Sequence, residues 1–194
     1  MNIISGSLRG LQLKAPAGMA TRPTAVRSRK ALFDSLGDLS GKVVADLFAG
    51  SGAIGLEAAS RGAASVWFAD SSPAAVRCIR ANLSKAAELG CTVPSEVLEL
   101  KLPEGAGRLL SLSGPDLVFA DPPYAETLDR LTGLLADKAF TEWCRKSILI
   151  WEVPADRGLV PPPPEWSLSG IRLFGGAKFA FFRRNSETEI QKGI

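Results

Sequence analysis

The chain has 194 residues, 46% of them hydrophobic and 22% charged, which excludes extensive disorder and fits one domain with a sizeable core. It contains no histidine, three widely spaced cysteines and no run near eighteen apolar residues, so we expect no metal site, no disulfide framework, no membrane span and a cytoplasmic location. The net charge of +3 hides an asymmetry, because residues 1–30 carry six cations and no acid, a distribution typical of polyanion binders.

The first forty residues are expected to form a small basic extension. Residues 2–4 and 11–14 can pair as a hairpin around two glycines, and residues 23–36 have a helical pattern. Apart from its charge, no composition break marks this extension as a separate fold. We therefore expect it to be attached to the domain that follows.

After Gly41 the chain alternates between strand and helix patterns, which predicts a doubly wound, mostly parallel α/β sheet. Two late apolar segments flank Gly175-Gly176 and predict an antiparallel hairpin, the last of seven strands. We divide the chain into a hairpin-and-helix extension at 1–40, the α/β domain at 41–185 and a flexible tail at 186–194. The strands are predicted at 43–48, 66–69, 95–100, 116–120, 147–153, 168–174 and 178–183, and the helices at 52–61, 73–89 and 126–137.

The stretch DLFAGSGAIG, residues 46–55, places three glycines between a strand and a helix. Glycines let the backbone approach a ligand closely, and Asp70, at the end of the next strand, can accept hydrogen bonds from a ribose diol. NAD and S-adenosylmethionine both fit this pattern. Asp46 favours S-adenosylmethionine, because a carboxylate there can meet the methionine ammonium but repels a pyrophosphate. The candidate cofactor-binding residues are Asp46, Phe48, Gly50, Ser51, Gly52, Gly55 and Asp70.

A second loop, Asp121-Pro122-Pro123-Tyr124, follows the buried strand that ends at Ala120. In a doubly wound sheet both loops open at the same edge. Proline fixes φ and lacks an N–H group, so carbonyl oxygens remain as acceptors. We expect the Asp121 side chain and the Pro122 carbonyl to accept the two hydrogens of a nucleobase amine, and Tyr124 to stack on the base. These four residues, Pro123 included, are the candidate catalytic residues, and no histidine is needed because the amine loses its proton after methylation.

Together, DLFAGSGAIG and DPPY resemble the S-adenosylmethionine-dependent methyltransferases that modify adenine N6 or guanine N2. TRPTAVRSRKALF, residues 21–33, resembles the segment before the first strand of bacterial 16S rRNA guanine-N2 methyltransferases of the RsmD type, and IISGSLRG and the final hairpin extend the likeness over nearly the whole chain. The resemblance implies a Rossmann-like class I methyltransferase fold and methylation of a guanine N2. The chain departs from the family's pattern at three places. Val26 stands where the family usually has an acid, just before the arginine that Arg27 matches, and Asp70 replaces a commoner glutamate. A third cofactor-side acid, expected after the third strand, has no clean counterpart in residues 99–104.

The resemblance also implies that 16S rRNA, naked or in an assembling small subunit, is the partner of a monomeric enzyme. Arginine contacts phosphates bidentately and stacks on unpaired bases, which suits the basic extension. Two of its arginines could instead pair with Asp34 or Asp38. The candidate RNA-binding residues are Arg9, Arg22, Thr24, Arg27, Arg29 and Lys178.

Three other functions remain open from the sequence. An adenine-N6 methyltransferase acting on DNA or RNA would use the same DPPY loop. A non-catalytic RNA-binding assembly factor would keep the fold without the chemistry, although the intact loops argue against it. An NAD oxidoreductase would need a base at the hydride site, and the sequence offers no evident one.

Overall fold

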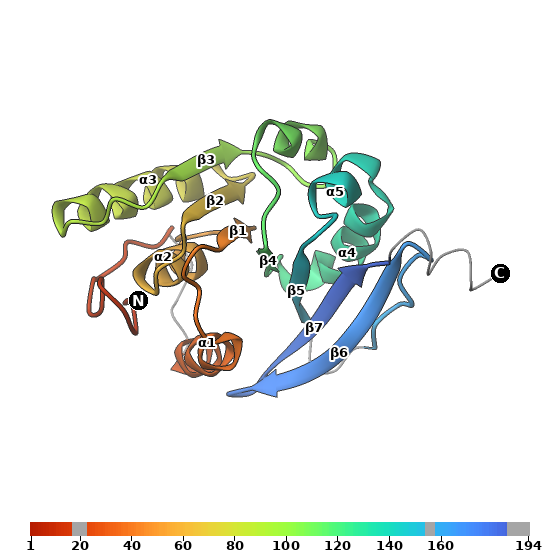
Figure 1. Cartoon of the computed structure of the whole chain (residues 1–194), viewed down its shortest axis with the longest axis horizontal. Helices are drawn as coiled ribbons and strands as arrows, with labels where there is room; N and C mark the ends of the chain where they lie inside the picture. The colour runs from red at the N-terminus through yellow and green to blue at the C-terminus, as the bar shows by residue number, and fades with distance from the viewer. Residues whose placement is uncertain (17–22, 154–157, 186–194) are drawn as a thin grey trace.

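The computed structural model describes residues 1–16, 23–153 and 158–185. It holds a seven-stranded sheet with the order β3-β2-β1-β4-β5-β7-β6 (Figure 1). The elements are α1 Pro23–Leu36, β1 Val43–Leu47, α2 Ala53–Ser60, β2 Ser65–Asp70, α3 Pro73–Glu88, β3 Ser95–Glu99, η1 Ala106–Ser111, β4 Leu117–Ala120, η2 Tyr124–Glu126, α4 Thr127–Ala136, α5 Lys138–Trp143, β5 Ile148–Val153, β6 Trp166–Phe174 and β7 Ala177–Arg184.

Strands β1 to β5 pair in parallel with one another, and β7 pairs antiparallel with both β5 and β6. The expected doubly wound sheet with an antiparallel C-terminal hairpin is therefore confirmed. The turn of that hairpin is Gly175-Gly176, and both glycines have positive φ, 54° and 96°, as a tight hairpin turn requires.

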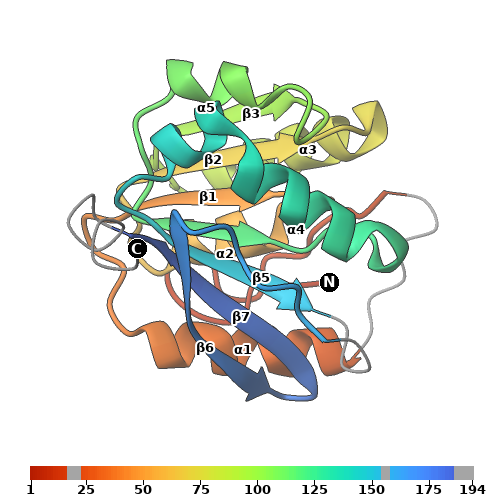
Figure 2. The ribbon, with the colours of Figure 1, turned by 90° about the vertical axis from the view of Figure 1, so that its right-hand side faces the viewer.

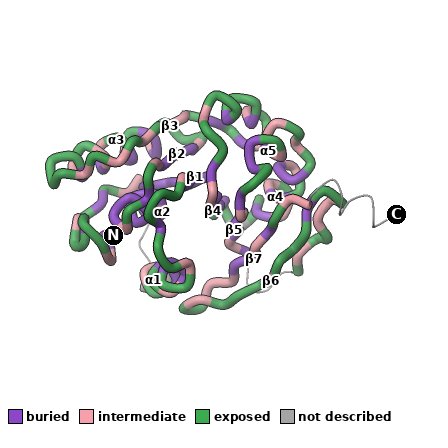
Figure 3. The backbone as a smooth tube through the Cα atoms, viewed as in Figure 1, coloured by how far each residue is buried: buried purple, intermediate pink, exposed green. Residues whose placement is uncertain are grey.

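Two apolar clusters cover the two faces of the sheet. Helices α1, α2 and α3 contribute to one cluster, which includes Phe33, Leu56 and Ile79, and helices α4 and α5 contribute to the other, which includes Leu134 and Phe140. Side chains of β1, β4 and β5 alternate between the clusters because successive residues of a strand point to opposite faces. Nearly all residues of the central strands β1 and β4 are accordingly buried (Figure 3).

The N-terminal extension shares the core of the sheet domain. Residues 1–13 form a hairpin with one β-bridge, Asn2 to Gln12, and Ile3 and Leu8 are buried in the same cluster as Val44 of β1. A Cβ at Gly6 would lie 1.8 Å from the Ser60 carbonyl oxygen of α2, so the hairpin backbone touches that helix.

Three short helical elements were not expected from the sequence: η1, η2 and α5. Helix α5 has only six residues, too few for a periodic pattern to be recognised. Its start nevertheless carries a signal, because the Asp137 side chain accepts a hydrogen bond from the Phe140 N–H at 2.8 Å, as an N-cap does. No helix among the described residues is long and apolar enough to span a membrane.

Candidate active site

The two loops singled out in the sequence open at the same edge of the sheet. Asp46 of β1 pairs with Phe119 of β4, and Leu47 pairs with Ala120, so β1 and β4 end side by side. On the other side, Leu47 pairs with Ala69 of β2, which brings the end of β2 to the same level. Neighbouring strands lie about 4.8 Å apart, so the residues that follow these three strands lie close together at the switch point between β1 and β4.

The glycine loop turns sharply from β1 into α2. Phe48, Gly50 and Gly52 all have positive φ, and the Gly52 N–H donates to the Ala49 carbonyl at 2.7 Å. A Cβ at Gly55 would lie 2.3 Å from the Phe68 ring, so glycine lets the first turn of α2 pack directly on β2. The loop and the start of α2 are therefore held close against the sheet, and most of their residues are buried.

Two carboxylates organise this loop. Asp70 accepts hydrogen bonds from the Gly50 N–H and the Ser72 N–H, both at 2.8 Å, and it ties the loop to the end of β2. Each carboxylate oxygen has a second lone pair, so Asp70 can also accept from a ligand hydroxyl. Asp46 is 3% exposed and accepts from the Gly55 N–H at 2.9 Å.

The carboxyl of Asp46 has a strongly shifted pKa. Burial, and to a lesser extent the charges of Asp121 and Asp70, raise its pKa to about 8, against the opposing hydrogen bond from Gly55 and the charge of Arg29. A buried carboxyl beside two further acids favours a cation as its neighbour. The residues present therefore fit a ligand with an ammonium group and a ribose, which S-adenosylmethionine provides.

The DPPY loop is fixed by the helix that follows it. The Pro123 carbonyl accepts from the Glu126 N–H at 2.9 Å and from the Thr127 hydroxyl at 3.2 Å, so it is committed to the turn that begins α4. Pro122 is buried, whereas Asp121 is exposed at the end of β4. The structure places Tyr124 at the start of η2, and its side chain lies outside the described part.

Comparison with known proteins places these loops in a family. The family model described as Conserved hypothetical protein 95 matches residues 1–183. Ribosomal RNA small subunit methyltransferase D of Escherichia coli K12 is 31% identical over 193 residues, which cover 97% of this chain and 92% of that protein. The chain belongs to the RsmD-type family of rRNA methyltransferases.

Two further proteins are similar to this RsmD-type chain. YlbH of Bacillus subtilis strain 168 is 40% identical over 129 residues, 65% of this chain and 68% of that protein. A solved structure of a hypothetical protein from Thermus thermophilus superimposes with a TM-score of 0.70 at 28% identity and covers 93% of this chain and 98% of that one.

The candidate RNA-binding residues of this RsmD-type chain differ in how far they are exposed. Arg27 of α1 is exposed, and so is Arg9 of the N-terminal hairpin. Thr24 lies in the first turn of α1, but its side chain is outside the described part of the structure. Arg22 lies wholly outside the described residues. Lys178 is half-buried on β7.

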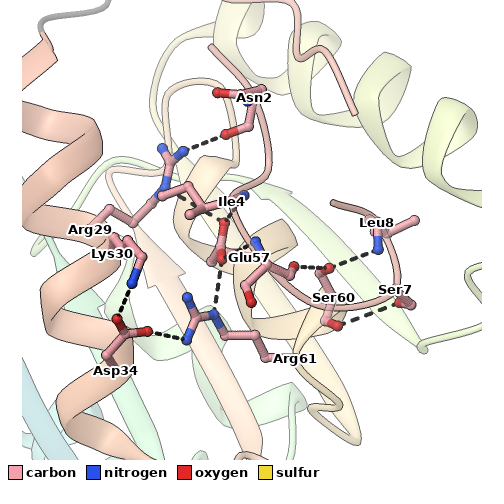
Figure 4. A network of polar contacts seen from close by, with 11 residues as sticks. Asn2, Ile4, Ser7, Leu8, Arg29, Lys30, Asp34, Glu57, Ser60 and Arg61 are labelled. Atoms are coloured by element: carbon pink, nitrogen blue, oxygen red, sulfur yellow. Dashed lines mark hydrogen bonds and ion pairs between the residues drawn. The ribbon is translucent and has the colours of Figure 1, made fainter. Parts of the chain in front are cut away.

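Arg29, which the sequence analysis expected to contact RNA, is buried within the protein. Arg29 is 5% exposed, its Nη2 donates to the Asn2 carbonyl at 2.5 Å, and its Nε lies 3.8 Å from Glu57 Oε2 (Figure 4). Burial lowers the pKa of the guanidinium, against the opposing charges of Glu57 and Asp46. Asp34, one of the acids considered as an alternative partner, binds Lys30 at 2.5 Å and Arg61 at 3.1 Å.

Glu57, which the sequence analysis did not single out, is the centre of this network. It is fully buried and accepts from the Ile4 N–H at 2.8 Å, the Ser5 N–H at 3.1 Å and Arg61 Nε at 2.9 Å. Its helix, α2, starts at the glycine loop. The hairpin, α1 and the cofactor-side helix are therefore tied together through one carboxylate.

Asn82 of α3 is a second residue that sequence reasoning missed. It is fully buried, and its side-chain amide donates to the carbonyls of Ser51 at 2.9 Å and Lys14 at 2.8 Å, while its oxygen accepts from the Lys14 N–H at 2.8 Å. It thus holds the glycine loop against the chain that leads into α1. A signal for it was present in the sequence. Asn82 comes four residues after Cys78 and three after Ile79, so it is a polar residue on the otherwise apolar face of the helix.

One aromatic contact joins the glycine loop to β5, beside the strand that leads into the DPPY loop. The partly exposed Phe48 ring meets the edge of Trp151 at 6.0 Å between centroids and 73° between planes. Trp151 pairs with Ala120, the last residue before the DPPY loop. Among the described residues no group of three or more His, Cys, Asp or Glu side chains could hold a metal ion.

Proposed function

We propose that the protein transfers a methyl group from S-adenosylmethionine to the exocyclic N2 amine of a guanine in 16S rRNA. Membership of the RsmD-type family supports rRNA as the substrate. The observation that carries the proposal is the pairing of β1 with β4, which sets the glycine loop and Asp121 at one edge of the sheet. When bound, the cofactor supplies an electrophilic methyl group on a positively charged sulfur.

At the cofactor end, Asp46 of β1 and Asp70 of β2 would bind different groups of the cofactor. Asp46 would hold the methionine ammonium, because its buried carboxyl lies beside the loop backbone and two further acids disfavour an anion there. Asp70 would hold the ribose hydroxyls while it keeps the Gly50 N–H in place. The glycines of the turn into α2 carry no side chain that would keep a ligand away from the backbone.

At the target end, the DPPY loop would orient the amine. The Asp121 carboxylate and the Pro122 carbonyl accept the two amine hydrogens, which places the nitrogen lone pair toward the methyl group. A hydrogen bond to a charged acceptor contributes about 1.5–3 kcal/mol, and stacking of the base on Tyr124 adds about 1–3 kcal/mol. The fixed turn after Pro123 keeps this loop rigid, so the geometry is set before the base arrives.

The reaction balances without a histidine. The nitrogen lone pair forms an N–C bond as the sulfur–carbon bond breaks, and the sulfur keeps the bonding electrons. The methylated amine then carries a positive charge and loses one proton. Asp121 is exposed at the end of β4, so that proton can pass to its carboxylate and on to water.

Nucleoside mass analysis tests the proposal. Small ribosomal subunits and 16S rRNA from cells that lack this protein would be incubated with the purified protein and methyl-labelled S-adenosylmethionine. We expect label in N2-methylguanosine, and a loss of at least about a hundredfold in rate for Asp121→Ala, which removes a charged acceptor and the amine's orientation. Label found only in adenosine, or an unchanged rate for Asp121→Ala, would contradict the guanine or the DPPY assignment respectively.

A further inference from the structure

The tip of the β6–β7 hairpin stands beside the active-site edge. Phe179 of β7 pairs with both Arg172 of β6 and Glu152 of β5. Trp151, the residue before Glu152, pairs with Ala120 of β4, so Glu152 is level with Asp121, the residue after Ala120. Arg172 is therefore level with Asp121 and lies three strands away along the sheet. At about 4.8 Å between strands this separation is about 14 Å, within the footprint of a single-stranded segment of several nucleotides.

The hairpin turn is fixed against α1, as both ribbon views show (Figures 1 and 2). A Cβ at Gly175 would lie 2.7 Å from the Ser28 nitrogen and 2.9 Å from the Arg27 carbonyl carbon, so the two backbones are in direct contact. This contact brings the exposed Arg27 of α1 next to the turn. The basic extension and the hairpin, far apart in the sequence, therefore form one surface.

The charge and geometry of this hairpin suit a polyanion. Residues 166–185 contain four cations and no acid. The exposed Arg172 guanidinium lies over the Phe181 ring, 5.4 Å from its centroid, opposite Gly170, which has no side chain to cover that ring. A guanidinium held over an aromatic ring loses less side-chain freedom on binding and can present its donors to a phosphate or a base.

We propose that Arg172, together with Arg27, forms an RNA-contact surface at the hairpin turn that binds the strand flanking the target guanine. The inference rests on the proposed function, since it takes rRNA as the ligand. Arg172 is the new contact, and the sheet register sets how far from the target base it acts. RNA fits this surface better than an acidic protein segment, because a pre-stacked planar cation can bind both phosphates and unpaired bases.

The test compares Arg172→Ala with Arg80→Ala in the full-length protein. Arg80 is an exposed arginine of α3, which packs on β2 and β3 at the opposite end of the sheet from the hairpin. Binding to 16S rRNA and to unmodified small subunits would be measured from about 50 to 300 mM salt. We expect Arg172→Ala to weaken binding about tenfold and to reduce the slope of log affinity against log salt by about 0.7, and Arg80→Ala to change neither. Arg172→Lys should keep the slope, because it keeps the charge.

The affinity for S-adenosylmethionine and the melting temperature should match wild type in both variants, which separates a lost contact from a damaged fold. If wild type methylates rRNA but Arg172→Ala binds it with unchanged affinity and slope, the surface is refuted and the proposed function stands. Equal weakening by Arg80→Ala would refute the surface too. If wild type neither binds nor methylates rRNA, the proposed function fails and this surface fails with it.

Discussion

The buried carboxylate of Glu57 gives the sharpest prediction about stability. Glu57→Ala removes the acceptor of two backbone N–H groups, at Ile4 and Ser5, and of the Arg61 Nε. It also leaves the buried Arg29 guanidinium without its anion. Breaking a buried ion pair by removing one partner costs about 3–5 kcal/mol, and an unsatisfied buried donor costs about 1–3 kcal/mol. These costs overlap because water and side chains can relax, so we expect a loss of about 4 kcal/mol.

Urea unfolding followed by circular dichroism measures this loss directly. In a chain of this size, about 4 kcal/mol corresponds to a fall in melting temperature of about 8–16 °C. Asp34→Ala is the matched control, because Asp34 also pairs with Arg61 but its side chain is 46% exposed, and such a pair contributes less than about 1 kcal/mol. A loss below about 1 kcal/mol for Glu57→Ala, or one equal to that of the control, would refute the structural role given to this network.

Three further predictions concern the cofactor loop. Gly55→Ala should lower the free energy of unfolding by about 1–3 kcal/mol and weaken S-adenosylmethionine binding, because the added methyl meets the Phe68 ring at 2.3 Å; denaturation and calorimetry test both, and a neutral variant would contradict the packing. Asn82→Ala should weaken the same binding about tenfold, since the Ser51 carbonyl loses its donor; unchanged affinity would remove Asn82 from the site. The pKa of Asp46 is about 8 folded against 3.8 unfolded, so the folded protein binds more protons and stability should fall as pH rises from about 4 to about 8. Asp46→Asn should remove that slope in the cofactor-free protein, and a slope that persists would assign it elsewhere.

The sheet could be predicted because each local signal agreed with the global pattern. The Ser72-Pro73 start of α3 is an example, since the Ser72 hydroxyl accepts from the Ala75 N–H at 3.4 Å as an N-cap should. The Gly175-Gly176 turn is another, with positive φ at both positions. Short elements such as η1 escaped because six residues carry too little periodicity to stand out.

The site was predictable to the extent that it depends on strand ends. A carboxylate directly after or at the end of a strand, as at Asp70 and Asp121, must lie at the ligand edge of a doubly wound sheet. Asn82 and Glu57 escaped because they accept from or donate to backbone groups 31 to 68 residues away in the sequence, which no local pattern encodes. Their roles follow from where α2 and α3 pack, and packing is decided by the whole chain.

Arg29 shows that a cation in a basic segment can be buried when it lies on the apolar face of a helix. A cluster of cations near the N-terminus indicates a nucleic-acid surface, yet a helix sorts its residues by face. Arg29 lies three and four residues before Leu32 and Phe33, which are fully buried, so it shares their face, while Arg27 and Lys30 are exposed. The apolar stripe was readable from the sequence; the anion that makes burial of Arg29 tolerable, Glu57, was not. Charge in such an extension should therefore be counted by helix face before it is assigned to RNA.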